Sequence, residues 1–272
     1  MNFLMVLILG LSGVAIGAYG TLIGIGGGVV IIPLLLLLFP DEPPRAITAI
    51  SMAVVFFNAL SGTVAYNRMK RIDYRTGVIF SLATVPGTIL GVLLTSYISR
   101  TLFQIIFGLL LTGLSVYIFL RPTARVNIST RGRGKTSRLV VDRSGTRYEF
   151  SFNMPLGIAI SFVVGFIAGI LGIGGGIIHV PALVTILGFP AHIATATSQF
   201  ILAITTFFGS ATHFVEGNLD TGWALVVVLS AGVIIGAQIG ARLSTRFGGK
   251  AIIRLLAGAL LLLGLRLLLI WR

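Results

Sequence analysis

Eight long apolar runs make up most of this chain and decide which solvent it can fold in. They cover residues 3–39, 46–66, 76–98, 101–120, 155–189, 193–214, 222–241 and 251–270. A helix needs about 20 apolar residues to cross a bilayer, so six of these runs have the length of one crossing. Only 10% of the 272 residues are charged, whereas soluble domains contain about 25%. The sequence therefore predicts an all-α polytopic membrane protein whose main surroundings are the lipid bilayer.

The two longest runs, residues 3–39 and 155–189, cannot be single straight helices. Each would be roughly 50 Å long, against a hydrocarbon core of about 30 Å. Both contain the pentapeptide Gly-Ile-Gly-Gly-Gly, at residues 24–28 and 172–176. Glycine adopts the left-handed backbone that a sharp break requires. We therefore expect each run to be a pair of helices that breaks at its pentapeptide.

The chain consists of two similar halves. Residues 17–36 align with residues 165–184 at an offset of 148, and eight of the twenty positions are identical. The likeness continues downstream, where Thr-Ala-Ile-Ser at 48–51 aligns with Thr-Ala-Thr-Ser at 195–198. We expect three segments, namely a first transmembrane repeat at 1–120, a basic linker at 121–153 and a second transmembrane repeat at 154–272.

The basic residues indicate that the halves cross the membrane in opposite senses, because cytoplasmic loops are enriched in Lys and Arg. Loops 67–75 and 242–254 each contain four basic residues, although they are not equivalent loops of the repeat. With the linker on the same side, 16 of the 20 basic residues are cytoplasmic. Each half is thus expected to be an inverted-topology repeat, made of a glycine-broken helix pair plus three transmembrane helices. Many secondary transporters follow this plan.

The linker is the longest hydrophilic stretch. Residues 139–150 have the pattern of a strand, a Ser-Gly turn and a second strand. Two interpretations stay open: a β-hairpin that lies against anionic headgroups, and a flexible connection between the repeats. The net charge of +13 is explained by such loops, so we do not expect nucleic acid as a partner.

Catalytic and metal-binding patterns are missing from the sequence. All seven acidic residues lie in loops or at the ends of the apolar runs, and there is no cysteine. Most hydrolytic chemistry needs paired carboxylates, and the common nucleophile and metal motifs are also absent. We therefore expect no enzyme activity, no metal site and no cofactor.

The groups that could bind a ligand inside the membrane are neutral. Each glycine pentapeptide precedes a short helix, so consecutive N–H groups meet the positive end of a helix dipole, an arrangement that favours an anion. Alternatively, the glycines serve only the chain break and close helix packing. The candidate substrate-binding glycines are Gly24, Gly26, Gly27, Gly28, Gly172, Gly174, Gly175 and Gly176.

Polar side chains occupy one face of the next helix in each half. The first-half row is Ser51, Asn58, Gly62 and Tyr66, and the matching second-half row is Ser198, Thr205, Gly209 and His213. The candidate substrate-binding side chains are Ser51, Asn58, Ser198, Gln199 and Thr205, with contacts between helices as the alternative role. His179 is a further candidate, for proton-linked transport, although a lone histidine can equally be a satisfied core residue.

These features resemble the TauE/SafE family of sulfite exporters, also called the toluene-sulfonate uptake permease family. Each half has a Gly-x-Gly-Gly-Gly loop followed five residues later by a proline, then an Ala-x-Ser helix, then a Gly-x-x-x-Gly helix. The residues that carry these last features are Pro33 and Pro181, Gly87 and Gly91, and Gly236 and Gly240. The resemblance covers nearly the whole chain except 121–153. It implies transport of sulfur-containing anions, such as sulfite and sulfonates, across a prokaryotic inner membrane.

We therefore expect a secondary transporter whose small sulfur-containing anion binds between the two glycine loops near the midplane. Access would alternate as one repeat rocks against the other. Two other functions stay open, a passive anion channel and a non-transporting membrane scaffold or sensor that uses the basic linker. The sequence also leaves open the substrate, the direction of transport, the coupling ion and whether the chain forms a homodimer.

Overall fold

Helices follow the apolar runs throughout the computed structural model, which describes residues 3–120, 136–219 and 222–269. In the first half they are α1 (Phe3–Ile23), α2 (Gly28–Leu38), α3 (Pro44–Arg68), α4 (Tyr74–Thr95) and α5 (Arg100–Leu120). In the second half they are α6 (Met154–Leu171), α7 (Gly176–Pro181), the π-helical turn η1 (Ala182–Ile186), α8 (Ala191–Val215), α9 (Trp223–Leu243) and α10 (Gly249–Leu269). Within the described ranges, seven helices are long and apolar enough to cross a membrane.

Both overlong runs break at their glycines, as predicted. Three glycines in each pentapeptide have left-handed backbone angles, with φ of 75–83° in the first and 69–95° in the second. The short helix that follows in the first half begins at Gly28, the last residue of the pentapeptide. In the second half, the expected single helix is divided after Pro181, where α7 continues as η1 and Leu187 donates its N–H to the carbonyl of Ala182.

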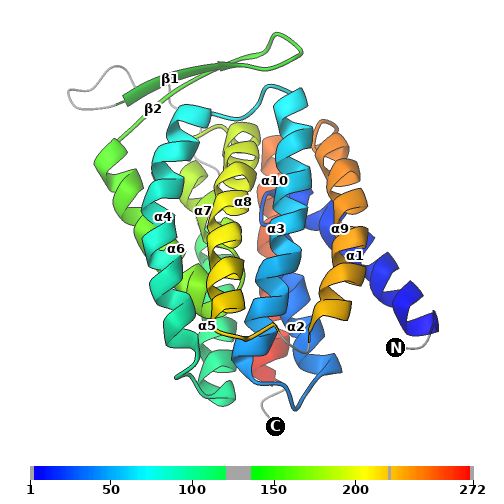
Figure 1. Ribbon diagram of the computed structural model, residues 1–272. Coiled ribbons are helices and arrows are strands. Elements are labelled where there is room, and N and C mark those ends of the chain that lie inside the picture. Colours follow the sequence, from blue (N-terminus) through cyan, green and yellow to red (C-terminus); the bar gives the residue numbers. More distant parts are fainter. Residues whose placement is uncertain (1–2, 121–135, 220–221, 270–272) are drawn as a thin grey trace.

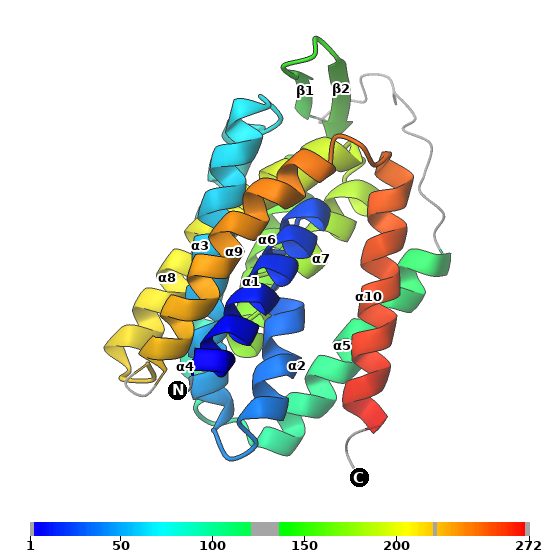
Figure 2. The same cartoon turned by 90° about the vertical axis from the view of Figure 1, so that its right-hand side faces the viewer.

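Helices of one half pack mainly on helices of the other half. α1 packs on α9 and α6 packs on α4, while α3 packs on α8 and α5 packs on α10 (Figures 1 and 2). When the two halves are exchanged, the α1–α9 contact becomes the α6–α4 contact, and the α3–α8 and α5–α10 contacts map onto themselves. In Figure 1, α3 rises toward the end that carries the hairpin, and α8 descends from that end. Within the central pair, Gly62 of α3 lies against Gln199 of α8, and Gly209 of α8 lies against Met52 of α3.

The tightest seams between the halves consist of glycines. Gly87 and Gly91 of α4 lie against α6, and a Cβ atom on Gly91 would overlap the carbonyl oxygen of Phe166. On the opposite side, Gly236 and Gly240 of α9 lie against α1 in the same manner. The Gly-x-x-x-Gly pattern thus allows helix backbones to touch, which is its usual role in membranes.

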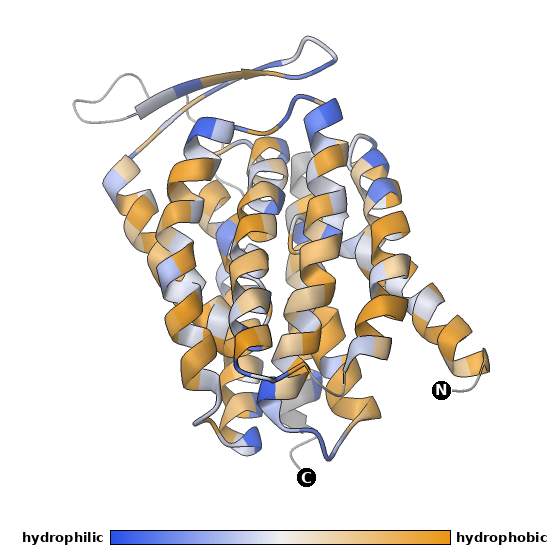
Figure 3. Ribbon diagram, viewed as in Figure 1, coloured by the Kyte–Doolittle hydropathy of each residue, from blue (hydrophilic) through white to orange (hydrophobic). Residues whose placement is uncertain are grey.

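The outer surface of the helical bundle is apolar. Figure 3 shows hydrophobic residues along the length of the helices and hydrophilic residues mainly at the two ends. Large side chains such as Leu82 and Val227 are 71% and 65% exposed. Such surfaces are stable only against lipid, so the protein is a multi-pass membrane protein.

The linker contains a β-hairpin that closes one end of the bundle (Figure 1). Its strands β1 (Thr136–Val141) and β2 (Arg147–Phe152) pair antiparallel, with the predicted Ser-Gly turn between them. Phe150 and Phe152 are buried, and their ring centroids lie 4.4 and 4.8 Å from that of Phe189. Residues 136–152 are therefore a docked hairpin and not a flexible connection. Residues 121–135 of the predicted linker lie outside the described residues.

Candidate functional site

The two glycine loops meet at the centre of the bundle, backbone against backbone. A Cβ atom on Gly176 would lie 2.7 Å from the carbonyl oxygen of Gly24, and one on Gly28 would lie 3.0 Å from the Cα of Ile173. The predicted meeting of the loops is thus present. Because the loops touch, an anion has to separate them or bind beside them.

Each glycine loop is held by a serine from the opposite half. Ser51 of α3 donates its hydroxyl to the carbonyl of Gly172 at 2.8 Å, and Ser198 of α8 donates to the carbonyl of Gly24 at 3.1 Å. Two of the predicted binding side chains therefore hold the loops in place. This crosswise anchoring explains why the Thr-Ala-x-Ser tetrapeptide occurs in both halves.

Thr48 and Thr195 complete these anchors, although we did not name them as candidates. A Cβ atom on Gly172 would lie 2.7 Å from the Cα of Thr48, and one on Gly24 would lie 2.9 Å from the Cα of Thr195. Only glycine leaves room for the facing threonine. The repeated tetrapeptide was the sequence signal that could have identified both residues.

Several buried N–H groups of the loops have no acceptor among the hydrogen bonds of the described residues. They belong to Gly27, Gly28 and Val29 of the first loop and to residues 173–177 of the second. The loops differ at the matching positions Gly26 and Gly174. The N–H of Gly26 donates to the carbonyl of Gly20, whereas the N–H of Gly174 has no acceptor among the described residues. A buried donor without an acceptor costs about 1–3 kcal/mol, so these groups mark the place where a bound anion would be most favourable.

Polar side chains surround the first loop. We call Thr21, Asn58 and Gln199, which are all fully buried, the first-loop junction. Thr21 donates its hydroxyl to Oδ1 of Asn58 at 3.2 Å, and Gln199 donates Nε2 to the carbonyl of Gly20 at 3.4 Å. Nδ2 of Asn58 and Oε1 of Gln199 have no partner. The junction therefore offers both a free donor and a free acceptor beside the first loop.

Two further residues shape this junction. A Cβ atom on Gly62 would lie 3.3 Å from Cδ of Gln199, so glycine there makes room for the amide. Tyr66 donates its hydroxyl to the carbonyl of Thr21 at 2.8 Å. The predicted polar row of α3 thus extends from the junction toward the hairpin end. Thr21 itself was not among the candidates, because one threonine in an apolar helix gives no periodic signal.

The repeat matches Asn58 to Thr205 and Gln199 to Met52, so these positions form a different set. We call Met52, Thr205 and Thr84, which contacts Thr205, the second-loop junction. The hydroxyls of Thr84 and Thr205 lie 2.8 Å apart and satisfy one another, while Met52 packs over Gly209 as Gln199 packs over Gly62. Thr205 is buried, but its hydroxyl already has a partner, so its role in substrate binding stays a prediction.

His179 and Gly175 lie at the edges of the arrangement. The Nε2 atom of His179 lies 3.0 Å from the hydroxyl of Ser161, and its ring stacks on Phe80. His179 thus has the contacts of a core histidine in this conformation. A Cβ atom on Gly175 would lie 3.1 Å from Cγ1 of Val164 and 3.3 Å from Cβ of Ala168, whereas the backbone carbonyl oxygen of Val164 would be 3.9 Å away.

The charges around the glycine loops and junctions also indicate which kind of ligand could bind there. Among the described residues, the buried carboxylates are Asp73 and Asp142, and both lie at the hairpin end. No group of three or more His, Asp or Glu side chains within the described ranges could hold a metal ion. The loops and junctions therefore present neutral dipoles only.

Comparison with known proteins identifies the family of this chain. A family model described as sulfite exporter TauE/SafE matches residues 9–267. The probable membrane transporter protein YunE of Bacillus subtilis is 34% identical over 274 residues, which cover 98% of this chain and 97% of that protein. A probable membrane transporter protein of Haemophilus influenzae is 30% identical, over 85% of this chain and 84% of its own. No solved structure matches the chain. The chain therefore belongs to the TauE/SafE sulfite exporter family and is a multi-pass membrane transporter.

Proposed function

We propose that the protein is a secondary transporter of small sulfur-containing oxyanions of the sulfite and sulfonate type. The anion binds at the first-loop junction, beside the two glycine loops. Unpaired N–H groups of both loops and Nδ2 of Asn58 donate to its oxygens. No covalent step is required, because the protein only has to exchange the anion's water shell for these donors.

The observation that carries the proposal is the set of buried donors that lack acceptors. An oxyanion accepts several hydrogen bonds at once, so one ligand satisfies donors that have no other partner in an apolar interior. The donors are neutral, and the described residues around them include no carboxylate that would favour a cation. Neutral donors also suit a transporter, because hydrogen bonds from a charged donor are stronger and would slow the release of the anion. The family name supports sulfur oxyanions within the class of small anions.

Alternating access between two inverted repeats is the mechanism that we propose. Its support is the opposite course of α3 and α8 and the matched contacts that each half makes with the other. Because Ser51 and Ser198 each anchor the loop of the opposite half, rocking one half displaces both loops. The touching loops are then a thin barrier that opens first to one side and then to the other.

Uptake of labelled sulfite into proteoliposomes tests this proposal, with taurine, sulfoacetate, thiosulfate, sulfate and chloride as competitors. We expect saturable uptake that one organosulfur anion blocks, together with counterflow of preloaded sulfite. Unitary currents without saturation would instead identify a passive channel and overturn the carrier mechanism. If folded protein gave no flux with any anion, the glycine loops would be packing elements and the proposal would be wrong.

Gly175→Val provides a variant test. The added side chain meets Val164 and Ala168 and no backbone atom within 3.4 Å, so the bundle can adjust, but φ of 95° strains the loop. We expect folded protein without saturable uptake. Gly113→Val is the matched control, because a Cβ atom on Gly113 meets nothing within 4 Å. Wild-type uptake by Gly175→Val would contradict the assignment of the second loop to the binding site.

A further inference from the structure

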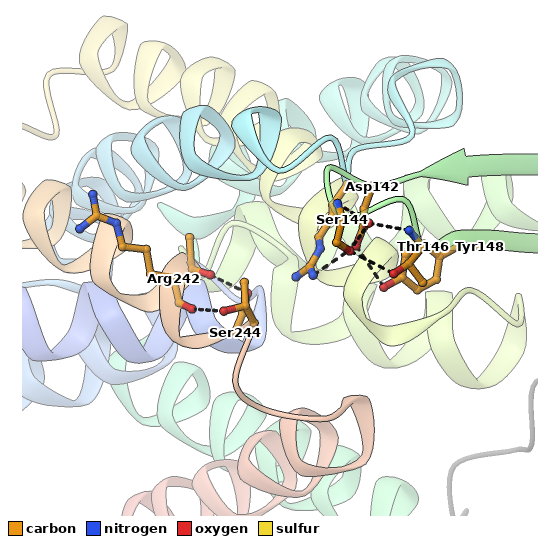
Figure 4. A network of polar contacts seen from close by, with 9 residues as sticks. Asp142, Ser144, Thr146, Tyr148, Arg242 and Ser244 are labelled. Carbon is orange, nitrogen blue, oxygen red and sulfur yellow. Dashed lines mark hydrogen bonds and ion pairs between the residues drawn. The ribbon is translucent and has the colours of Figure 1, made fainter.

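A second polar site lies at the hairpin end of the bundle, where three segments that are distant in sequence meet. They are the α3–α4 loop, the turn of the hairpin and the α9–α10 loop, and between them is a cavity of about 490 Å³. Its lining residues are Met69, Arg71, Asp142, Arg143, Ser144 and Thr245. Figure 4 shows the turn residues Asp142 and Ser144 in the same view as Ser244, which lies at the end of α9. We call this cavity the hairpin pocket.

Arg71 is charged and nearly buried, yet most of its donors are unused. Its side chain is 11% exposed, and its one ion pair joins Nη2 to Oδ2 of Asp142 at a long 3.4 Å. The Nε and Nη1 atoms are buried and have no hydrogen-bond partner. A guanidinium has five N–H donors in a planar fork that matches an oxyanion. Arg71 is therefore poorly satisfied by the protein alone.

Asp142, by contrast, does not depend on Arg71. Its carboxylate accepts hydrogen bonds from the N–H and hydroxyl of Ser144, at 2.9 and 2.6 Å, and from the N–H of Thr146 at 3.0 Å. Burial acts to raise the pKa of Asp142, but these hydrogen bonds and the Arg71 charge outweigh it and lower the pKa. The hairpin turn thus stabilises its own carboxylate, which leaves the guanidinium available to another acceptor.

The charges around the pocket favour an anion. Two arginines and one aspartate line it, which gives a local charge of +1. The backbone N–H of Arg143 donates to the carbonyl of Met69, so the second arginine is fixed at the rim. Asp73, the other buried carboxylate of this end, is already paired with Arg138. Among the described residues that line the pocket, Asp142 is therefore the only carboxylate that competes with an incoming anion for Arg71.

We propose that the hairpin pocket binds a small oxyanion, of the sulfate, sulfite or phosphate type, through the guanidinium of Arg71. Nε and Nη1 of Arg71 are buried in this conformation. To bind the ligand, the guanidinium therefore has to turn into the pocket, where contacts with the oxyanion replace its long contact with Asp142. Asp142 is thus an internal carboxylate that competes with the oxyanion for Arg71.

Two hydrogen bonds link the residues of the pocket to the proposed transport site. The N–H of Arg71 donates to the carbonyl of Tyr66, and the hydroxyl of Tyr66 donates to the carbonyl of Thr21 in the first-loop junction. The pocket is therefore at the aqueous end of the polar row of α3, where a transported anion would enter or leave. The oxyanion site does not depend on the proposed function. Only the further statement that its natural ligand is the transported anion rests on that function.

Binding of inorganic sulfate to the purified full-length protein in detergent tests the site. Thermal unfolding is followed at increasing sulfate, with chloride added to keep the ionic strength constant, and saturable stabilisation gives a dissociation constant. We expect Arg71→Gln to weaken binding at least about tenfold and Arg71→Lys to weaken it less, because lysine keeps the charge but not the fork. Arg75→Gln, which removes an exposed arginine outside the pocket, is the matched control and should bind like the wild type.

Asp142→Asn separates a ligand site from a merely structural ion pair. Asparagine keeps the oxygen that the turn needs but removes the competing charge, so sulfate should bind several-fold more tightly. A structural ion pair would instead lose stability in both Arg71→Gln and Asp142→Asn, with no change in the sulfate dependence. That result, or equal sulfate binding by wild type and Arg71→Gln, would overturn the proposal.

Two further arms identify the source of the oxyanion and separate the two proposals. Arg71-dependent stabilisation by phosphatidylglycerol but not by sulfate would support the site and assign its ligand to a lipid headgroup. Asn58→Leu should lower sulfite uptake about 10- to 100-fold and keep the Arg71-dependent sulfate binding. If uptake fails in every variant while this binding persists, only the transport proposal is wrong. If uptake is normal in wild type and no Arg71-dependent binding occurs, only the hairpin pocket proposal is wrong.

Discussion

The two junctions beside the glycine loops occupy equivalent places in the two halves but differ in chemistry. At the first-loop junction, Asn58 and Gln199 are fully buried and each has an unpaired polar atom. At the second-loop junction, the equivalent positions hold Thr205 and Met52. The hydroxyl of Thr205 is paired with that of Thr84, and the side chain of Met52 has no N–H or O–H group that needs a partner. The serine anchors, by contrast, are the same on both sides.

This difference separates two roles that the residues of a repeat can have, namely building the fold and binding the ligand. Features present in both halves, such as the anchors and the left-handed glycines, build the fold, because each half needs the same break and the same contact. Features present in one half only are not required by the shared fold and can therefore bind the ligand. An unpaired amide in an apolar interior lowers stability, so its presence on one side alone points to binding.

The largest effect is expected where the halves agree. Gly24→Val and Gly172→Val each place a side chain against the backbone of a facing threonine, at positions with φ of 83° and 69°. Each should cost about 2–5 kcal/mol from backbone strain and overpacking combined. Yield and thermal unfolding in detergent measure the loss, with Gly113→Val as the tolerated control. Failure of only one of the two variants would break the structural equivalence of the halves.

The next effect is expected where the halves differ. Asn58→Leu removes the free donor, and we expect sulfite uptake to fall about 10- to 100-fold, the value of a hydrogen bond to a charged group. Its thermal stability should stay equal or rise, because an unsatisfied buried amide is lost. Thr205→Val serves as the comparison and should change uptake less than about threefold, since its hydroxyl is already paired. Equal losses in both variants would contradict a binding site at the first-loop junction.

A smaller effect tests the amide over Gly62. Gln199→Met copies the residue that packs over Gly209 in the other half, so we expect a folded protein whose uptake falls about three- to tenfold through loss of a neutral hydrogen bond. The initial rate of sulfite uptake at low concentration measures this loss. Unchanged uptake would show that the glutamine serves only to hold the carbonyl of Gly20.

The smallest effect concerns the hairpin end, which has no counterpart in the other half. The pKa of Asp142 is lowered in the folded protein, so its contribution to stability is present above the unfolded value of about 4 and is lost as the pH falls through the folded pKa. We expect the unfolding midpoint of wild type to fall more steeply than that of Asp142→Asn between pH 5 and pH 3. Parallel curves would mean that this carboxylate does not stabilise the docked hairpin.

Much of the candidate site could be predicted because its residues obey a repeat or a period. The pentapeptides were identified by their duplication, and Ser51, Asn58 and Ser198 by a shared helix face. Thr21 and Arg71 could not be found in this way. Thr21 belongs to the site because α1 lies beside α3, and Arg71 was one of several basic loop residues until its unused donors and the adjacent pocket were seen.

The sequence by itself determined the solvent, the helices, their two breaks and the family. These follow from local quantities: the length of apolar runs, the positive φ that glycine permits and the spacing of small residues. Only the tertiary structure decided which loop each serine holds, which amides stay unpaired and how the hairpin meets Arg71. The serine anchors and the Arg71–Asp142 contact join residues more than 70 positions apart. The strength of each contact also depends on which groups nearby are already satisfied, a property that no single segment contains.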